Sequence, residues 1–222
     1  MLRYTAAEKL ILMRSADLIT YLRVALVILV LYFVTLKISP AILIILFAIA
    51  LIMDGLDGYF AVLDVSGGKI GFIKYAKAAI GYAPYAKEVK KAKLDASKSA
   101  TYGARLDVAG DRIIEYSLWA LFTYLGVVPF FVFIIVIIRH SIVDSFMGSK
   151  GTSSKMKTKL GRVLYSSSAS RAGINILKFI TFSYLMLVYI SNYPQSIGYV
   201  FTGALVLFII ARGVAEVYES FS

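Results

Sequence analysis

Six apolar stretches, each about 20 residues long, constrain this chain more than any other feature of its sequence, because a helix of that length crosses the hydrocarbon core of a membrane. The expected spans are 18–36, 41–63, 103–126, 129–146, 171–190 and 198–217. Hydrophobic residues make up 59% of the chain, whereas roughly half is usual for a soluble domain. The sequence therefore predicts an all-α integral membrane protein, a bundle of six transmembrane helices.

The segments outside the spans have patterns of their own. Six spans and their connections account for the length of the chain, so we expect a single domain over residues 1–222. Residues 1–16 mix basic and apolar side chains, which is typical of an amphipathic helix on the membrane surface. Residues 64–102 form a long polar insertion, whose Lys- and Ala-rich parts predict helices at 73–80 and 84–100.

The basic residues indicate an orientation. Lysine and arginine are concentrated in the N-terminal segment and in the 64–102 and 147–170 connections, which share one side of a six-span bundle. Because basic loops remain in the cytoplasm, we expect a multi-pass protein of the cell membrane with both termini cytoplasmic. We interpret the net charge of +11 as attraction to anionic lipid headgroups, with no nucleic acid as partner.

Two acidic stretches lie near the cytoplasmic ends of expected spans, where charged groups are costly and call for a functional explanation. The first follows the i, i+3, i+4, i+7 spacing of one helix face, with Asp54, Asp57, Gly58 and Ala61. The second follows i, i+4, i+8, with Gly103, Asp107 and Asp111. Four acids on two helix faces, with small residues beside them, predict a cytoplasmic cation site that has room for a large ligand.

The kind of cation follows from the available ligands. The chain has no cysteine, which excludes disulfides and thiolate metal sites. His140 is the one histidine, so a histidine-rich zinc or haem site is not expected. Carboxylate oxygens suit hard cations, and we therefore expect Mg²⁺ or Mn²⁺.

The acidic stretches resemble the signature of the CDP-alcohol phosphotransferase family, D-x-x-D-G-x-x-A-R followed by G-x-x-x-D-x-x-x-D. Residues 17–23, Asp-Leu-Ile-Thr-Tyr-Leu-Arg, are similar to the N-x-L-T-x-x-R opening of that family. With the six-span layout, the resemblance covers most of the chain. Three departures stand out: Val62 replaces the arginine, Asp17 replaces the asparagine, and residues 63–102 replace a spacer of about eight residues.

The resemblance implies that two divalent cations hold the pyrophosphate of a CDP-linked lipid while an alcohol hydroxyl attacks the lipid-side phosphorus and CMP leaves. The metal ligands it implies are Asp54, Asp57, Asp107 and Asp111. Asp111 is also the expected general base. The CDP-binding residues it implies are Asp57, Gly58, Ala61, Gly103 and Asp107. A homodimer is expected from the resemblance as well.

The acceptor is expected to be a small polar alcohol, with glycerol phosphate and inositol phosphate among the phosphorylated choices. Arg105, Arg139 and Arg171 are the residues expected to bind it, since arginine pairs well with phosphate. For Arg139 and Arg171 the alternative is that they are topology signals that reach toward lipid headgroups.

The predicted function is therefore a membrane phospholipid synthase that transfers a phosphatidyl or archaetidyl group from a CDP-linked lipid to this alcohol. A second function remains open from the sequence, a cation- or proton-coupled transporter, because acids within a membrane also serve ion pathways. Inverted repeats or broken helices would favour the transporter, and the sequence has no evident example of either.

Overall fold

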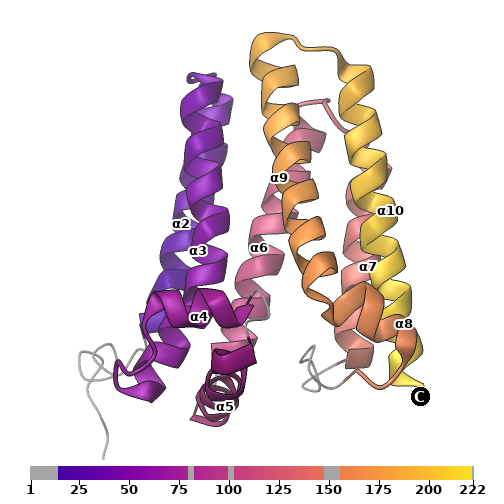
Figure 1. Cartoon of the computed structure of the whole chain (residues 1–222). Coiled ribbons are helices and arrows are strands. Elements are labelled where there is room, and N and C mark those ends of the chain that lie inside the picture. The colour runs from indigo at the N-terminus through magenta and orange to yellow at the C-terminus, as the bar shows by residue number, and fades with distance from the viewer. Residues whose placement is uncertain (1–14, 80–82, 100–102, 148–155, 222) are drawn as a thin grey trace, which may run out of the picture. The chain divides into compact units, whose positions relative to one another are not determined.

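The computed structural model describes residues 15–79, 83–99, 103–147 and 156–221, and these residues form helices and no strand (Figure 1). The elements are α2 (Ser15–Thr35), α3 (Pro40–Ser66), α4 (Phe72–Ala79), α5 (Ala83–Ser99), α6 (Gly103–Tyr124), α7 (Phe130–Met147), α8 (Lys159–Gly161), the π-helix η3 (Arg162–Ser166), α9 (Ser168–Ser191) and α10 (Gln195–Ser220). The predicted all-α class is confirmed for the described residues, and the two helices expected within residues 64–102 are present as α4 and α5.

Four helices are long and apolar enough to cross a membrane: α2, α3, α9 and α10. A helix also forms over each of the other two expected spans, as α6 and α7, but neither is among these four. α6 is too polar to be counted among these spans, because its first half carries five charged residues: Arg105, Asp107, Asp111, Arg112 and Glu115. The count of six spans thus stays a prediction, as does the surface helix over 1–16, nearly all of which lies outside the described residues.

The chain divides into two compact units, and each is described by itself. The first unit comprises the described residues of Met1–Leu29 and Ile49–Ile114, which include α4, α5 and the start of α6. The second comprises Val30–Ala48 and Glu115–Ser222, in which α10 packs against both α7 and α9.

Residues with left-handed backbone end several helices. Gly67 and Gly68, with φ of 57° and 81°, follow α3, and Gly126, with φ of 71°, follows α6. Glycine adopts this conformation without the steric cost of a Cβ. Asn192 (φ 53°) caps α9, and its N–H donates to the Leu187 carbonyl.

Apolar side chains on the candidate spans face outward. Ile45 and Ile52 on α3 and Val200 and Leu207 on α10 each expose more than half of their surface. Exposed apolar side chains of this kind are costly in water and favourable in lipid. The exterior of these helices thus agrees with a membrane protein.

The core of the second unit is an aromatic cluster. The ring of Phe182 on α9 is fully buried and lies 4.9 Å from Trp119, 6.1 Å from Phe122 and 6.2 Å from Phe47, measured between ring centroids. Trp119 and Phe122 come from α6 and Phe47 from α3. Edge-to-face and stacked aromatic pairs add directional attraction to the burial of apolar area, so this cluster fixes how the three segments pack.

Replacing Phe182 by alanine is expected to destabilise the second unit by about 3–5 kcal/mol, because the cavity removes ring contacts from three neighbours. Thermal unfolding of the purified protein in detergent would measure the loss. Phe131→Ala is the matched control, since that ring is 63% exposed on α7. An equal loss of stability in the two variants would contradict the role of the cluster.

Candidate functional site

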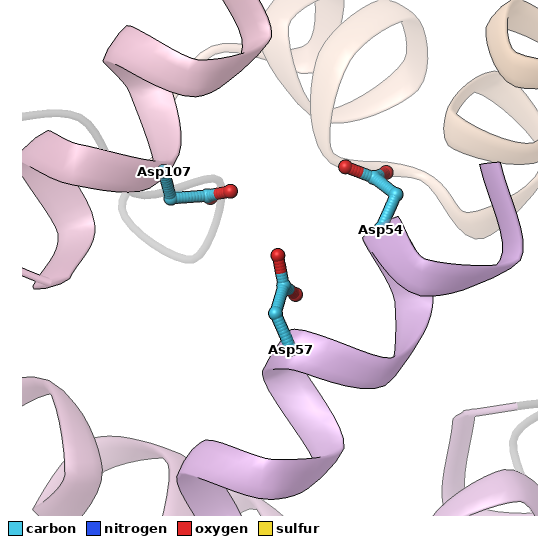
Figure 2. A group of neighbouring side chains, drawn as sticks. All are labelled: Asp54, Asp57 and Asp107. Carbon is cyan, nitrogen blue, oxygen red and sulfur yellow. The ribbon is translucent and has the colours of Figure 1, made fainter. Parts of the chain in front are cut away.

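Three carboxylates of the first unit converge, as the two acidic stripes predicted. Ligand oxygens of Asp54, Asp57 and Asp107 all lie within 4.8 Å of one another, and Figure 2 shows the side chains pointing toward a common space. Asp54 and Asp57 lie one turn apart on α3, and Asp107 extends from α6. The helical spacing places the acids on each helix, and the carboxylates of α3 and α6 converge.

Arg23 of α2 lies at the centre of these acids. Its guanidinium forms ion pairs with Asp54, with Asp107 at 3.5 Å and with Asp111 at 2.8 Å, and only 3% of its side chain is exposed. A buried arginine is tolerated when its charge is paired and hydrogen-bonded. The ion pairs therefore bring Asp111 into the same cluster and join α2 to both acidic helices.

The role of Arg23 was missed by sequence reasoning. The residue was quoted as the end of the 17–23 motif, but no function was given to it. A signal was present, because an arginine inside an apolar stretch needs a partner. The sequence does not tell which acids of a chain that has several will provide that partner.

Thr20 and Gly110 explain how α2 comes so close to α6. A Cβ added to Gly110 would lie 2.8 Å from Thr20 Cγ2, closer than such atoms approach in proteins. Gly110 lies directly before Asp111, and Thr20 lies one turn before Arg23. The small residue thus permits the close helix packing common between membrane helices and allows Arg23 to reach Asp111.

The cluster carries an excess of negative charge, which favours the binding of a cation. Four carboxylates face one guanidinium, so the formal charge is −4 + 1 = −3 when all are ionised. Asp57 Oδ2 is buried among these carboxylates. Buried anionic oxygens need a counter-charge or a donor. The donor set, composed of carboxylate oxygens, fits Mg²⁺ or Mn²⁺.

The small residues of the predicted CDP site have different surroundings. A Cβ at Gly58 would lie 2.8 Å from the Tyr75 hydroxyl oxygen, so this glycine is required for a close approach by the insertion. Ala61 is half-buried on α3. Gly103 and Arg105 lie in the first turn of α6, and their side-chain surroundings fall outside the described part of the structure.

In the second unit, Arg139 is engaged by α10. Its Nη2 donates to Glu216 at 2.6 Å and its Nε donates to the Ile209 carbonyl at 3.1 Å. Gly213 leaves space for it, because a Cβ there would lie 2.7 Å from Arg139 Nε. Arg212 Nη1 donates to the carbonyl and the hydroxyl of Ser170, next to the exposed Arg171 in the sequence.

A second buried acid, Glu115, was also missed by sequence reasoning. Its Oε2 accepts from Lys178 Nζ at 2.7 Å and lies 3.8 Å from Nε2 of the buried His140. Glu115 continues the stripe of Asp107 and Asp111 by one further turn of α6. This spacing is the sequence signal that identifies Glu115.

Divalent cations are expected to raise the thermal stability of the protein. Binding to the folded state alone adds about 2.7 kcal/mol at a concentration of 100 Kd, so Mg²⁺ or Mn²⁺ should raise the melting temperature. Asp57→Asn should lose most of that increase, and Glu88→Gln, on the exposed face of α5, should keep it. An unchanged melting temperature of the wild-type protein would contradict a metal site.

Comparison with known proteins supports the resemblance over part of the chain. A sequence model of the CDP-alcohol phosphatidyltransferase family matches residues 13–62. The matched segment includes the 17–23 motif and the whole first acidic stretch, and the second stretch lies beyond it. No curated protein and no solved structure matches the chain.

Proposed function

We propose that this protein is a membrane phospholipid synthase that transfers a phosphatidyl or archaetidyl group from a CDP-linked lipid to the hydroxyl of a small polar alcohol. The observation that carries the proposal is the meeting of the four aspartates around Arg23. The family match over residues 13–62 and the apolar helices support the same class of enzyme.

Asp54, Asp57, Asp107 and Asp111 would hold the two divalent cations, Mg²⁺ or Mn²⁺. When bound, such cations stabilise the charge on the attacking and leaving oxygens of an in-line displacement. Arg23 orients the acids by pairing with three of them. It also reduces their mutual repulsion, which otherwise opposes three carboxylates at this separation.

Asp111 is the proposed general base. Its Oδ1 accepts a hydrogen bond from Arg23 Nη2 at 2.8 Å, which fixes the orientation of the carboxylate. The carboxylate takes the proton of the acceptor hydroxyl as the oxygen attacks the lipid-side phosphorus. The bond from that phosphorus to the bridging pyrophosphate oxygen breaks, and CMP departs with the electron pair.

The nucleotide would contact Asp57, Gly58, Ala61, Gly103 and Asp107. Ala61 and Gly103 are small and allow a ligand to approach the helix backbone, whereas the space beside Gly58 holds the Tyr75 hydroxyl. The carboxylates would reach the nucleotide through the cations. The location that goes with this function is the cell membrane, with the termini and the site in the cytoplasm. A homodimer remains part of the proposal.

Arg105, Arg139 and Arg171 are the proposed acceptor residues, and Arg212 is added to them. Glu216 pairs with Arg139 and lies one turn after Arg212 on α10. Arg212 donates a hydrogen bond to Ser170, which directly precedes Arg171 in the sequence. Three arginines linked in this way exceed the charge of the one glutamate between them. Such an excess supports a phosphorylated alcohol, because guanidinium groups bind phosphate through paired hydrogen bonds.

The reaction predicts release of CMP that requires a CDP-linked lipid, an alcohol and Mg²⁺ or Mn²⁺ together. Asp111→Asn should lower the rate by about 10²- to 10⁴-fold, the usual contribution of a general base. Asp64→Asn is the matched control, since Asp64 is exposed and lies off the acidic stripe. The proposal fails if no alcohol in a panel yields CMP, or if Asp111→Asn equals the wild type.

Arg171→Gln is expected to raise the KM for a phosphorylated acceptor by roughly tenfold, the loss of one charge-assisted hydrogen bond, with little effect on the KM for the donor lipid. Steady-state kinetics with glycerol phosphate and inositol phosphate would measure both constants. Lys159→Gln, an exposed residue of the same basic segment, is the control. Equal effects of the two substitutions would contradict acceptor binding by Arg171 and indicate that this residue serves only to set the orientation of the chain in the membrane.

A further inference from the structure

The insertion is anchored on the helix that carries the first acidic stretch. Val62 on α3 is fully buried and forms a small core with Ile70, with Val89 and Ala92 of α5, and with the partly buried Tyr75 and Ala78 of α4. Figure 1 shows α4 and α5 at the end of α3. Position 62 is where the family pattern has an arginine, so this chain uses that position to hold the insertion.

This anchoring places Tyr75 directly against the acidic stretch. Its hydroxyl occupies the space beside Gly58 in which a Cβ would lie only 2.8 Å away, and Gly58 follows Asp57 in the sequence. The Tyr75 ring is held from one side by Tyr59, at 5.5 Å between centroids and an angle of 61°. The polar end of Tyr75 is therefore fixed next to the predicted nucleotide site.

Lys93 of α5 lies close to the same ring. Its Nζ is 4.6 Å from the Tyr75 centroid, within the range of a cation–π interaction. The lysine side chain is exposed. The insertion thus brings a hydroxyl and a positive charge to the part of α3 where valine has replaced the arginine.

We propose that Tyr75 and Lys93 bind the nucleotide of the CDP-linked donor, so that the insertion supplies polar contacts in place of the arginine at position 62. This inference rests on the proposed function. The Tyr75 hydroxyl donates a hydrogen bond to the nucleotide, and the Lys93 ammonium pairs with its phosphate. A phenol and an ammonium group together match a ligand that has both neutral and anionic oxygens.

The test compares Tyr75→Phe and Lys93→Gln with the wild type in the purified full-length protein with Mg²⁺. Tyr75→Phe keeps the ring that packs in the insertion core and removes only the hydroxyl. Lys93→Arg keeps the charge, and Lys90→Gln, exposed on the same helix, is the matched control. Two readouts are needed: equilibrium binding of CMP, and separate KM values for donor and acceptor.

We expect each of Tyr75→Phe and Lys93→Gln to weaken CMP binding and to raise the donor KM by roughly threefold to tenfold, the loss of one hydrogen bond or exposed charge contact. The acceptor KM and the melting temperature should stay unchanged. Lys93→Arg should retain most of the affinity, and Lys90→Gln all of it. A change confined to the melting temperature would show a structural role and overturn the inference.

The outcomes separate this inference from the proposed function. Wild-type protein that binds CMP but releases none with any acceptor would contradict the transferase, and the variants would still decide the role of Tyr75 and Lys93 in binding. Active enzyme whose CMP affinity and donor KM are the same in both variants would overturn only the inference. Wild-type protein that does not bind CMP would overturn it as well.

Discussion

The burial of one arginine among four carboxylates is the interaction on which the first unit depends. Arg23 belongs to α2, whereas its partners belong to α3 and α6, so the ion pairs determine how three helices lie together. Removing Arg23 would leave three carboxylates without their counter-charge, which is more costly than the ion pairs themselves are favourable. Thr20 and Gly110 permit the necessary approach. The same contacts that hold the helices therefore also shape the site.

The balance of charge distinguishes this cluster from the ion pairs of the second unit. There Arg139 pairs with Glu216, and Lys178 pairs with Glu115, so each buried acid has its own cation. In the first unit one guanidinium pairs with three acids, and a fourth acid, Asp57, lies beside two of them. Paired charges are sufficient to explain a structural role. An excess of carboxylates over positive groups favours binding of a cation, and this is the physical argument for a metal site.

Much of this arrangement could be predicted from the sequence, because it depends on the spacing of residues along single helices. Spacing placed Asp54 and Asp57 on one helix face and Asp107 on another, and the insertion was divided correctly into α4 and α5. The partners of Arg23 and the pairing of Glu115 with Lys178 could not be predicted, since periodicity gives the face of one helix and not which helix packs against it. The prediction of six spans also depends on more than apolar patterning. Charges that the site needs make the first half of α6 too polar to be recognised as a span.

Two departures from the family pattern have one physical explanation. A valine at position 62 would be an exposed apolar residue beside an acidic site if the insertion did not cover it. An arginine there would, in this chain, lie within a core of Ile70, Val89 and Ala92, where an unpaired charge is strongly unfavourable. The valine and the insertion therefore depend on each other. Because the core they form positions Tyr75 against Gly58, the longer spacer is more than an added loop: it places an aromatic side chain directly against the first acidic stretch.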